Sequence, residues 1–594
     1  MRHRTDRALE LTFAAILLAL GVGILGRGYW TPDEPREADI AWRMSWQTDR
    51  AVPLLAGEAF CEKPPLAYWI AGASIRAFGA DAWAARLPNL LYALVTACAV
   101  GLLGRRSAGA VAGVAAAAAV ATFLLTYQVA IWLATDAPLL ATVAVALLGL
   151  YSGFYANRTG ERLRGYTGMH AALALGFLSK SAAAWMVPAL GLGMLVIWER
   201  RWRELLRWEL YVGLGLQAVI ILTWVAFVYT GADGLAHLRV FFWNNLAGRF
   251  AHVDAPEELQ YAGAHRNSPG KYLLELPVYL WPWTLLVMAA ARRAWRQRHA
   301  PPDELRPVRF AVAVFVPTLG VLSIAATARN IYLAPALPGL ALLLGWWARE
   351  SFKTCDRWDR RALRGTAALL LIAVAAIAGA VLIVGRDSWT ALPNHVSFSA
   401  VSVMGLLAGV MLASVAWRAA GRGLVRRGLL ALLLAYCALL VGPASQLYGR
   451  VDGWQDLGSI GRAIGHDSAG RPLILFAPDE TTRAFIDLYA RTSVEWIAGP
   501  ISPVSIQALR LQLARTPQSV VVVQLPGSRN SNAVRELAQR FGLRPRSQGG
   551  NSSAAEPVWP ATVGLRIDHV YSLPNGRRYA LLAPREAATS PDSG

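Results

Sequence analysis

The sequence predicts a polytopic α-helical membrane protein with a soluble α/β domain at its C-terminal end. Of the 594 residues, 55% are hydrophobic and only 16% are charged, whereas a soluble globular protein has about 25% charged residues. Thirteen apolar runs approach the length of roughly 20 residues that a helix needs to cross a bilayer. Beyond about residue 450, short strands and amphipathic helices replace these runs. The composition therefore excludes a disordered chain and a small disulfide-stabilised scaffold.

The predicted membrane domain covers residues 1–448. If all thirteen runs cross and the N-terminus is cytoplasmic, the seven cytoplasmic segments hold 28 of the 58 lysine and arginine residues in about 85 positions. Basic residues collect in short cytoplasmic loops, so the pattern favours thirteen spans and explains the net charge of +20 without nucleic acid. The alternative joins the fifth and sixth runs, because the fifth is short and ends at Lys180. The runs lie at residues 8–26, 83–103, 108–126, 131–152, 168–180, 182–198, 210–229, 272–291, 308–326, 332–348, 363–384, 398–417 and 428–443.

Residues 449–594 form the predicted periplasmic α/β domain. An odd number of spans places this segment on the side opposite the N-terminus. Asn575-Gly576 predicts the turn of a hairpin, and Ser531 is a suitable N-cap for the helix that follows it. The expected elements are strands at 471–478 and 519–525, helices at 481–491, 505–515 and 531–541, and a flexible loop at 547–560.

The first outside loop, residues 27–82, carries the pattern most typical of a functional site. Five charged residues fall within seven positions, namely Asp33, Glu34, Arg36, Glu37 and Asp39. Carboxylates beside a bilayer are costly unless they are solvated or paired, so their clustering indicates a water-filled site. The alternative is a salt-bridged helix start, because Pro32 followed by acidic residues also suits a helix N-terminus.

Lysine usage adds a second signal. The chain has four lysines against 54 arginines, and two of the four, Lys63 and Lys180, lie on the predicted outside face. A compact ammonium group can bind a phosphate as a point charge. Alternatively, Lys63 neutralises Glu62, and Lys180 interacts with the C-terminal end of its own helix.

These motifs resemble a known family. TPDEPREADIAWRM, followed by FCEKPPLAYWIAGASIRAFG, is similar to the first outside loop of the bacterial lipid A aminoarabinose transferases. They belong to the polyprenyl-phosphate-sugar glycosyltransferases of the C-type membrane fold (GT-C), which include protein O-mannosyltransferases. The resemblance continues in order to about residue 350, through WLATDAPLL, GFLSKSAAAWMVPAL, FFWNNLAGRFA and RNIYLAPALPGLALLLG. The sequence departs from the family pattern at Glu37, usually Tyr, at Phe60-Cys61, typically Tyr-Phe, and at Asn244-Asn245, often acidic or histidine. These departures leave the sugar and the acceptor open.

The resemblance implies an inner-membrane glycosyltransferase that works on the periplasmic face. It would move a sugar, 4-amino-4-deoxy-L-arabinose or another amino sugar, from undecaprenyl phosphate to lipid A or another envelope glycan or protein acceptor. Membrane lipids are the other expected partners. No cofactor is required by the pattern, and a divalent metal among the carboxylates is left open.

The resemblance and the charge requirements of the reaction also assign roles to residues. The leaving lipid phosphate needs cationic partners; the candidates are Arg36, Lys63, Lys180 and Arg249, with Tyr332 as a further contact. Asp33 is the candidate that orients or deprotonates the acceptor, and Glu34, Asp136 and Glu62 are further candidate carboxylates. If the acceptor is an anionic phosphate, no base is needed, and Asp33 instead positions the donor sugar.

Three other functions are weighed against this one. A protein or polysaccharide glycosyltransferase of the same fold would attack with a hydroxyl group. A flippase or transporter of lipid-linked sugars would place polar residues midway along broken helices, often with internal repeats, and neither feature is evident in the sequence. A non-catalytic scaffold leaves the carboxylates and lysines unexplained.

Overall fold

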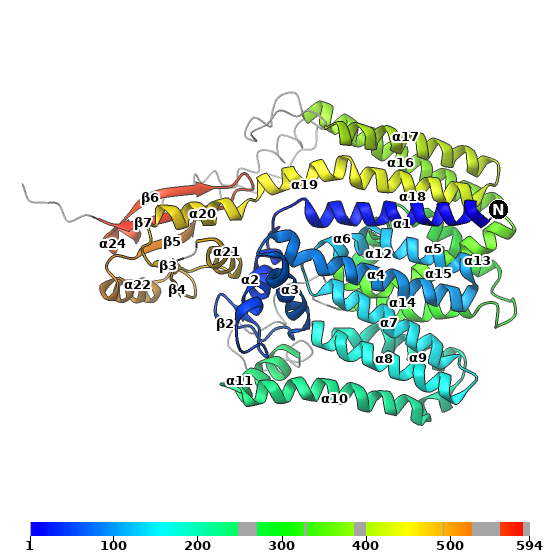
Figure 1. Cartoon of the computed structure of the whole chain (residues 1–594), viewed down its shortest axis with the longest axis horizontal. Helices are drawn as coiled ribbons and strands as arrows, with labels where there is room; N and C mark the ends of the chain where they lie inside the picture. The colour runs from blue at the N-terminus through cyan, green and yellow to red at the C-terminus, as the bar shows by residue number, and fades with distance from the viewer. Residues whose placement is uncertain are drawn as a thin grey trace, which may run out of the picture.

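The chain folds into a long helical bundle with a small α/β domain at one end (Figure 1). The computed structural model describes residues 2–246, 270–325, 329–384, 399–490, 492–525 and 559–585. The bundle helices run roughly along the long axis of the molecule, and the N-terminus lies at the end of the bundle away from the α/β domain. The loop between α1 and α4 lies between the bundle and this domain.

Each of the thirteen apolar runs contains at least one helix in the structure. Two runs are bent: α5 and α6 meet at 63°, and α12 and α13 meet at 111°. Ser181, with a left-handed φ of 56°, separates α8 from α9, so the fifth and sixth runs form two helices. The bundle helices are α1 (Arg2–Leu25), α4 (Ala82–Ala108), α5 (Ala110–Thr122), α6 (Leu124–Ile131), α7 (Asp136–Phe154), α8 (Thr159–Lys180), α9 (Ala183–Trp198), α10 (Trp208–Thr230), α12 (Lys271–Tyr279), α13 (Thr284–Arg296), α14 (Arg306–Ile324), α15 (Leu337–Lys353), α16 (Arg357–Val384), α17 (Ala400–Gly421) and α18 (Val425–Val441).

Length and apolarity identify fewer crossings than the charge pattern predicts. Among the described residues, eight helices are long and apolar enough to span a membrane, and ten if each bent pair is one span. Two further apolar helices are shorter, Glu10–Leu25 and Ala183–Trp198. Thirteen crossings therefore stay a prediction. Short helices join the bundle elements: η1 (Trp202–Leu206), α11 (Gly234–Arg239), η2 (Val240–Leu246) and η6 (Asn330–Ala336).

The first outside loop is an ordered layer between the bundle and the α/β domain. It contains α2 (Asp33–Trp46), a hairpin of β1 (Leu54–Leu55) and β2 (Glu58–Ala59), and α3 (Leu66–Phe78). The inner face of α2 buries Ile40 and Met44 against Phe60 and Tyr68, so apolar packing fixes the helix that begins with Asp33 and Glu34.

The C-terminal domain is a five-stranded mixed sheet with helices. The strands are ordered β4-β3-β5-β7-β6; the first three are parallel, and β7 is antiparallel to both β5 and β6. Two cores, one on each set of alternating strand residues, hold it together. α19 (Pro443–Trp454) packs against α17 and α18 of the bundle and leads into this domain. The elements of the domain are α20 (Leu457–Asp467), β3 (Leu473–Phe476), α21 (Glu480–Ala490), β4 (Val494–Ile497), α22 (Pro503–Arg515), β5 (Val520–Leu525), α24 (Trp559–Thr562), β6 (Leu565–Ser572) and β7 (Arg578–Pro584).

Most of the predicted elements of this domain are confirmed. The strands at 471–478 and 519–525, the helices at 481–491 and 505–515, and the hairpin at Asn575-Gly576 are all present. The edge strand β4 was not predicted, because its four residues are too few to show a period. The helix predicted at 531–541, its N-cap Ser531 and most of the loop at 547–560 lie outside the described residues. The domain boundary predicted after residue 448 falls inside α19.

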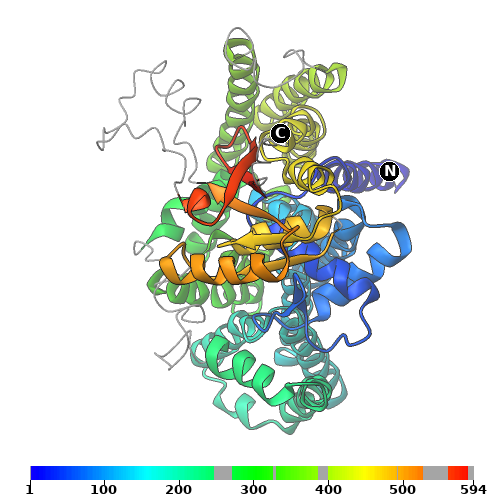
Figure 2. The same cartoon turned by 90° about the vertical axis from the view of Figure 1, so that its left-hand side faces the viewer.

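The α/β domain docks on the first outside loop through α21. Viewed from its own end, the domain lies in front of α2 and the bundle (Figure 2). Arg36 on α2 pairs with Glu480 at 2.6 Å, and Arg43 pairs with Asp487. The hydroxyl of Thr481 donates a hydrogen bond to the carbonyl of Pro32 at 3.2 Å. The residue just before Asp33 is therefore in contact with the C-terminal domain.

Candidate functional site

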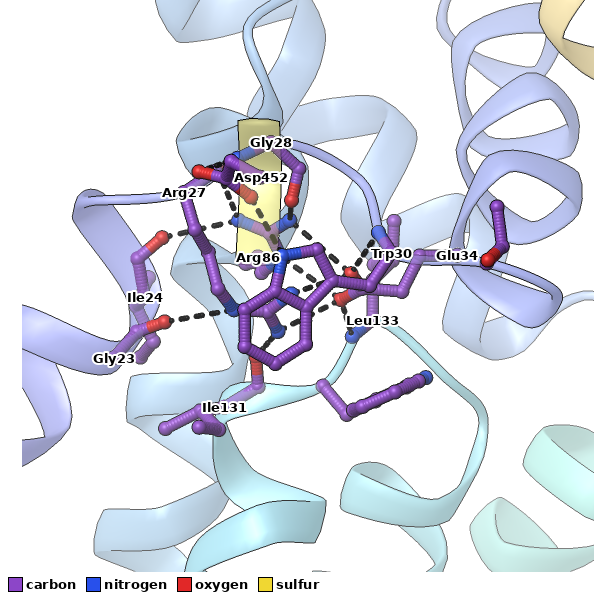
Figure 3. A network of polar contacts seen from close by, with 12 residues as sticks. Gly23, Ile24, Arg27, Gly28, Trp30, Glu34, Arg86, Ile131, Leu133 and Asp452 are labelled. Carbon is purple, nitrogen blue, oxygen red and sulfur yellow. Dashed lines mark hydrogen bonds and ion pairs between the residues drawn. The ribbon is translucent and has the colours of Figure 1, made fainter. Parts of the chain in front are cut away.

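Glu34 sits at the centre of a buried ion cluster with Arg27 and Arg86 (Figure 3). Its carboxylate accepts two hydrogen bonds from Arg27, at 2.6 and 3.0 Å, and two from Arg86, at 2.9 and 3.3 Å. The backbone amides of Trp30 and Leu133 donate two more, both at 2.7 Å. Burial alone would raise the pKa of Glu34, but the two guanidinium groups lower it. The carboxylate is therefore ionised, and both of its oxygens are hydrogen-bonded within the protein.

The same cluster ties the bundle to the start of the C-terminal segment. Asp452 in α19 accepts hydrogen bonds from the amide of Gly28 at 2.9 Å and from the indole of Trp30 at 2.6 Å (Figure 3). The guanidinium of Arg27 lies 4.1 Å from the centre of the Trp30 ring. The turn at residues 27–30 is thus held from three sides: by α1, by α4 and by α19.

The burial and the hydrogen bonds of Glu34 favour a structural role over the predicted catalytic one. The side chain is 0% exposed, and its two oxygens accept six hydrogen bonds. A group in this position has no free surface for a substrate, and its observed contacts are structural.

Asp33, its neighbour, points elsewhere. Both of its oxygens pair with Arg329, which precedes η6. The Asp33 side chain is 15% exposed and that of Arg329 is 49% exposed, so this pair faces solvent. Burial would raise the pKa of Asp33, but Arg329, followed by Lys63 and Arg36, lowers it below its usual value. Asp33 is therefore an ionised carboxylate at an accessible position.

Lys63 lies close to Asp33 but pairs with another carboxylate. Its ammonium group donates to Glu37, so its ion-pair partner is not its sequence neighbour Glu62, as one sequence interpretation held. The departure from the family pattern at Glu37 thus supplies a counter-charge for Lys63. Asn245 in η2 donates a hydrogen bond to the backbone carbonyl of Glu62, which connects this loop to another departure from the family pattern.

Three further candidates meet at the ends of α7 and α8. Lys180, the last residue of α8, contacts the carboxylate of Asp136, the first residue of α7, at 2.5 Å. The ammonium group also lies 5.0 Å from the ring centre of Tyr332 in η6. Three residues assigned to one site from separate motifs are therefore in mutual proximity.

Arg329 links the two groups electrostatically. Burial would lower its pKa, but the bond to Asp33, followed by the charges of Asp33, Tyr332 and Asp136, raises it. The site thus combines the pairs Asp33–Arg329, Lys63–Glu37 and Asp136–Lys180, in which each cation is partly exposed while Glu37 and Asp136 are buried. Cations in such pairs can exchange a protein carboxylate for a phosphate, because a phosphate offers more charge and more acceptor oxygens.

Three further predictions concern Arg249, a metal ion and Arg36. Arg249 lies outside the described residues, so its place relative to Lys63 stays a prediction. Within the described ranges, no group of three or more His, Cys, Asp or Glu residues could hold a metal ion. Arg36 is directed to Glu480 of the C-terminal domain at 2.6 Å, so in this structure its charge serves domain docking.

Sequence reasoning missed the partners of the acidic motif. Arg27, Arg86 and Asp452 stand alone in their segments, and only the fold joins them to Glu34 and its loop. Arg329 is the first residue of RNIYLAPALPGLALLLG, one of the segments that resemble the family. This position is the one signal in the sequence that could have identified it.

Comparison with known proteins bears on the same site. Residues 62–227 match the family described as dolichyl-phosphate-mannose-protein mannosyltransferase. The crystal structure of ArnT from Cupriavidus metallidurans bound to undecaprenyl phosphate superposes on the chain with a TM-score of 0.70, covering 98% of this chain and 99% of ArnT at 18% identity. The chain has the fold of ArnT. The structure of the same protein in the apo state gives a TM-score of 0.67.

Curated relatives agree with this fold. The undecaprenyl phosphate-alpha-4-amino-4-deoxy-L-arabinose arabinosyl transferase of Pseudomonas paraeruginosa is 30% identical over 381 residues, 62% of this chain and 65% of that protein. The transferase of the same name from Pseudomonas aeruginosa is 30% identical over 384 residues, 64% and 66% of the two chains. The chain therefore matches just under two thirds of the length of these relatives. The predicted resemblance and the GT-C fold class are confirmed, and the chain is a multi-pass membrane protein like ArnT.

Proposed function

We propose that this protein is a glycosyltransferase that moves a sugar from undecaprenyl phosphate to an acceptor in the cell envelope. The sugar proposed first is 4-amino-4-deoxy-L-arabinose, and the acceptor proposed first is lipid A. One observation carries the proposal: the pairs formed by Asp33, Lys63 and Asp136, each with a partly exposed cation, lie on the first outside loop and at the ends of α7 and α8, in a chain with the ArnT fold.

The cations of the site suit a lipid phosphate leaving group. Lys63 and Lys180 keep 20% and 15% of their side chains exposed, and both can turn from their carboxylates to a phosphate. Negative charge grows on the leaving phosphate as the glycosidic bond breaks, and fixed cations stabilise it at that moment. Arg249 is proposed as a further cation, with Tyr332 beside Lys180 as a neutral contact.

The carboxylates have complementary roles. Asp33 is proposed to orient the acceptor or to accept its proton, since it is ionised and accessible. For an anionic phosphate acceptor, Asp33 instead holds the donor sugar. Asp136 and Glu62 are supporting carboxylates, and we propose a structural role for Glu34.

The proposed orientation places the N-terminus in the cytoplasm and the α/β domain in the periplasm. Engineered thiols at Asn267 and Gly470 should then react with an impermeant reagent added outside intact cells. Thiols at His299 and Asp356 should be protected. Labelling at 299 without labelling at 470 would contradict this orientation.

The activity is tested by lipid analysis. Lipid A from a strain with the gene should carry the added sugar in its mass spectrum, and lipid A from the deletion strain should not. Complementation with Lys63→Ala or Arg249→Ala should restore much less modification than wild type. Groups that act on one phosphate behave as a unit, so the double variant should lose less than the product of the two single losses.

A matched exchange tests whether Lys63 only neutralises a carboxylate. The double variant Glu37→Lys with Lys63→Glu preserves the ion pair and reverses its direction. A phosphate role predicts that this exchange abolishes transfer. Full activity with unchanged affinity for undecaprenyl phosphate would contradict that role.

A second acceptor class is supported by the match of residues 62–227 to the protein mannosyltransferase family. That candidate transfers the sugar to a hydroxyl group of an envelope protein and uses Asp33 as a general base. Unmodified lipid A together with gene-dependent glycopeptides would favour it over the first candidate.

A further inference from the structure

A groove of about 350 Å³ opens between α1, α5, α15 and α18. Its lining runs along α5 from Ala110 to Ala119, which is about 14 Å of helix at 1.5 Å per residue. Arg426 at the start of α18 lies at one end of the groove, and Trp283 lies deeper. The indole of Trp283 donates a hydrogen bond of 2.8 Å to the hydroxyl of Thr122, the last residue of α5. The groove therefore reaches to about the depth of one leaflet of a bilayer core of roughly 30 Å.

The walls of this groove are apolar and open to the surroundings. Val111 and Val114 on α5 are 39% and 42% exposed, and Phe352 on α15 is 38% exposed. Ala115 and Ala118 form a shallow floor between these larger side chains. An occupant must be apolar and narrow.

The mouth of the groove carries positive charge without a counter-ion. Arg426 is exposed and has no acidic partner among the residues that the structure describes, and the same holds for Arg418, Arg422 and Arg427 in the adjoining turn. Arginines on the neighbouring helix α13 differ, because Arg293 pairs with Asp359 at 3.0 Å. The charge at the mouth thus complements an anionic headgroup.

We propose that the groove binds one acyl chain of an anionic glycerophospholipid, with the headgroup phosphate at Arg426. Basic pockets between transmembrane helices bind anionic headgroups in this way. The lipid comes from the leaflet at the basic end of the bundle, away from the α/β domain. The site is separate from the Asp33 cluster, and the proposal does not depend on the transferase activity.

Native mass spectrometry of the full-length protein in a mild detergent tests this proposal. The protein is titrated with phosphatidylglycerol or with phosphatidylcholine of the same acyl chains. Three variants are compared with wild type: Arg426→Gln at the mouth, Ala115→Trp on the floor, and Arg203→Gln, an exposed arginine of η1 far from the groove, as a charge control. Val410→Trp, on the exposed face of α17, is the control for adding a large side chain.

Wild type and both controls should bind one phosphatidylglycerol roughly fivefold more tightly than phosphatidylcholine, the effect of about one basic residue at a membrane surface. Arg426→Gln should abolish this preference, and Ala115→Trp should remove the bound lipid of both kinds while the melting temperature stays near that of wild type. Equal binding of the two lipids by wild type would overturn the proposal. An unchanged preference in Arg426→Gln, or a polyprenyl phosphate mass in the groove-dependent complex, would also overturn it.

Discussion

Asp33 and Glu34 are adjacent carboxylates in the first turn of α2, yet they have opposite environments. Glu34 is fully buried between Arg27 and Arg86 and accepts six hydrogen bonds. Asp33 lies on the other side of the turn and pairs with Arg329, whose side chain is half exposed. Consecutive residues on a helix point about 100° apart, so one motif supplies both a structural and an exchangeable charge.

The comparison teaches how to separate the two kinds of charge in a membrane-surface cluster. A buried ion pair holds its geometry because breaking it leaves an unpaired charge in a medium of low dielectric constant. A partly exposed pair contributes little to stability, and its members remain available to a ligand. The partners and their exposure, not the residue type, distinguish the two cases.

The largest expected effect is on catalysis, from Asp33→Asn. Removing a general base costs about 100-fold to 10,000-fold in rate, and the isosteric amide keeps the packing of α2. Transfer by purified protein and its melting temperature are measured together. Asp303→Asn, an exposed acid paired with Arg306 at 2.5 Å outside the site, is the control. Activity of Asp33→Asn within threefold of wild type would assign Asp33 only a role in the start of α2. The functional difference between Asp33 and Glu34 would then be lost.

The next largest effect is on stability, from Glu34→Gln. Removing one partner of a buried ion cluster costs about 3–5 kcal/mol, because Arg27 and Arg86 stay buried with unbalanced charge. Thermal unfolding should show a clearly lowered melting temperature. The control Glu350→Gln breaks exposed pairs with Arg349 and Lys353 and should cost at most about 1 kcal/mol. Wild-type stability combined with lost transfer would instead make Glu34 a catalytic group.

A third carboxylate of α2, Asp39, predicts that docking of the α/β domain depends on pH. Burial, followed by the nearby Asp487, raises the pKa of Asp39 well above its usual value, so the docked domain favours protonated Asp39. This contribution is fully present below the ordinary pKa of an aspartic acid and is lost as pH rises through the raised pKa. The protection factors of the α21 amides, which compare their exchange rates with the intrinsic rate at each pH, should therefore fall over that rise.

The matched variant for this effect is Asp39→Asn, which is neutral at every pH. Its side-chain oxygen can still accept the hydrogen bond that the backbone amide of Ala56 donates to Asp39 at 2.5 Å. Its protection factors in α21 should not depend on pH over the same range. An identical pH dependence in wild type and Asp39→Asn would assign the effect to another group.

The smallest effect is expected from Glu480→Gln. Its pair with Arg36 at 2.6 Å is 39% exposed on the Glu480 side, and pairs of this kind contribute about 0–1 kcal/mol. Stability should change little, while KM for the lipid donor is the quantity to watch because Arg36 becomes free to turn toward the site. A loss of stability as large as that of Glu34→Gln would place domain docking among the structural charges.

The sequence by itself determined the class of this protein and most of its elements. The length and period of an apolar run can be read from that stretch of sequence alone. Every predicted run accordingly contains a helix. In the C-terminal domain, the Asn575-Gly576 turn and the VVVV strand at residues 520–523 are equally local signals. The acidic loop and the two outside lysines marked the region of the site without any contact information.

Only the tertiary structure decided how the charges are shared. Lys63 had two acids nearby in sequence or in the loop, and the fold paired it with Glu37, 26 residues away. Glu34 required Arg86 from α4 and an amide at Leu133, and Asp33 required Arg329, 296 residues further along the chain. Electrostatic partners are chosen by distance and burial in three dimensions, and neither quantity has a local signature in the chain.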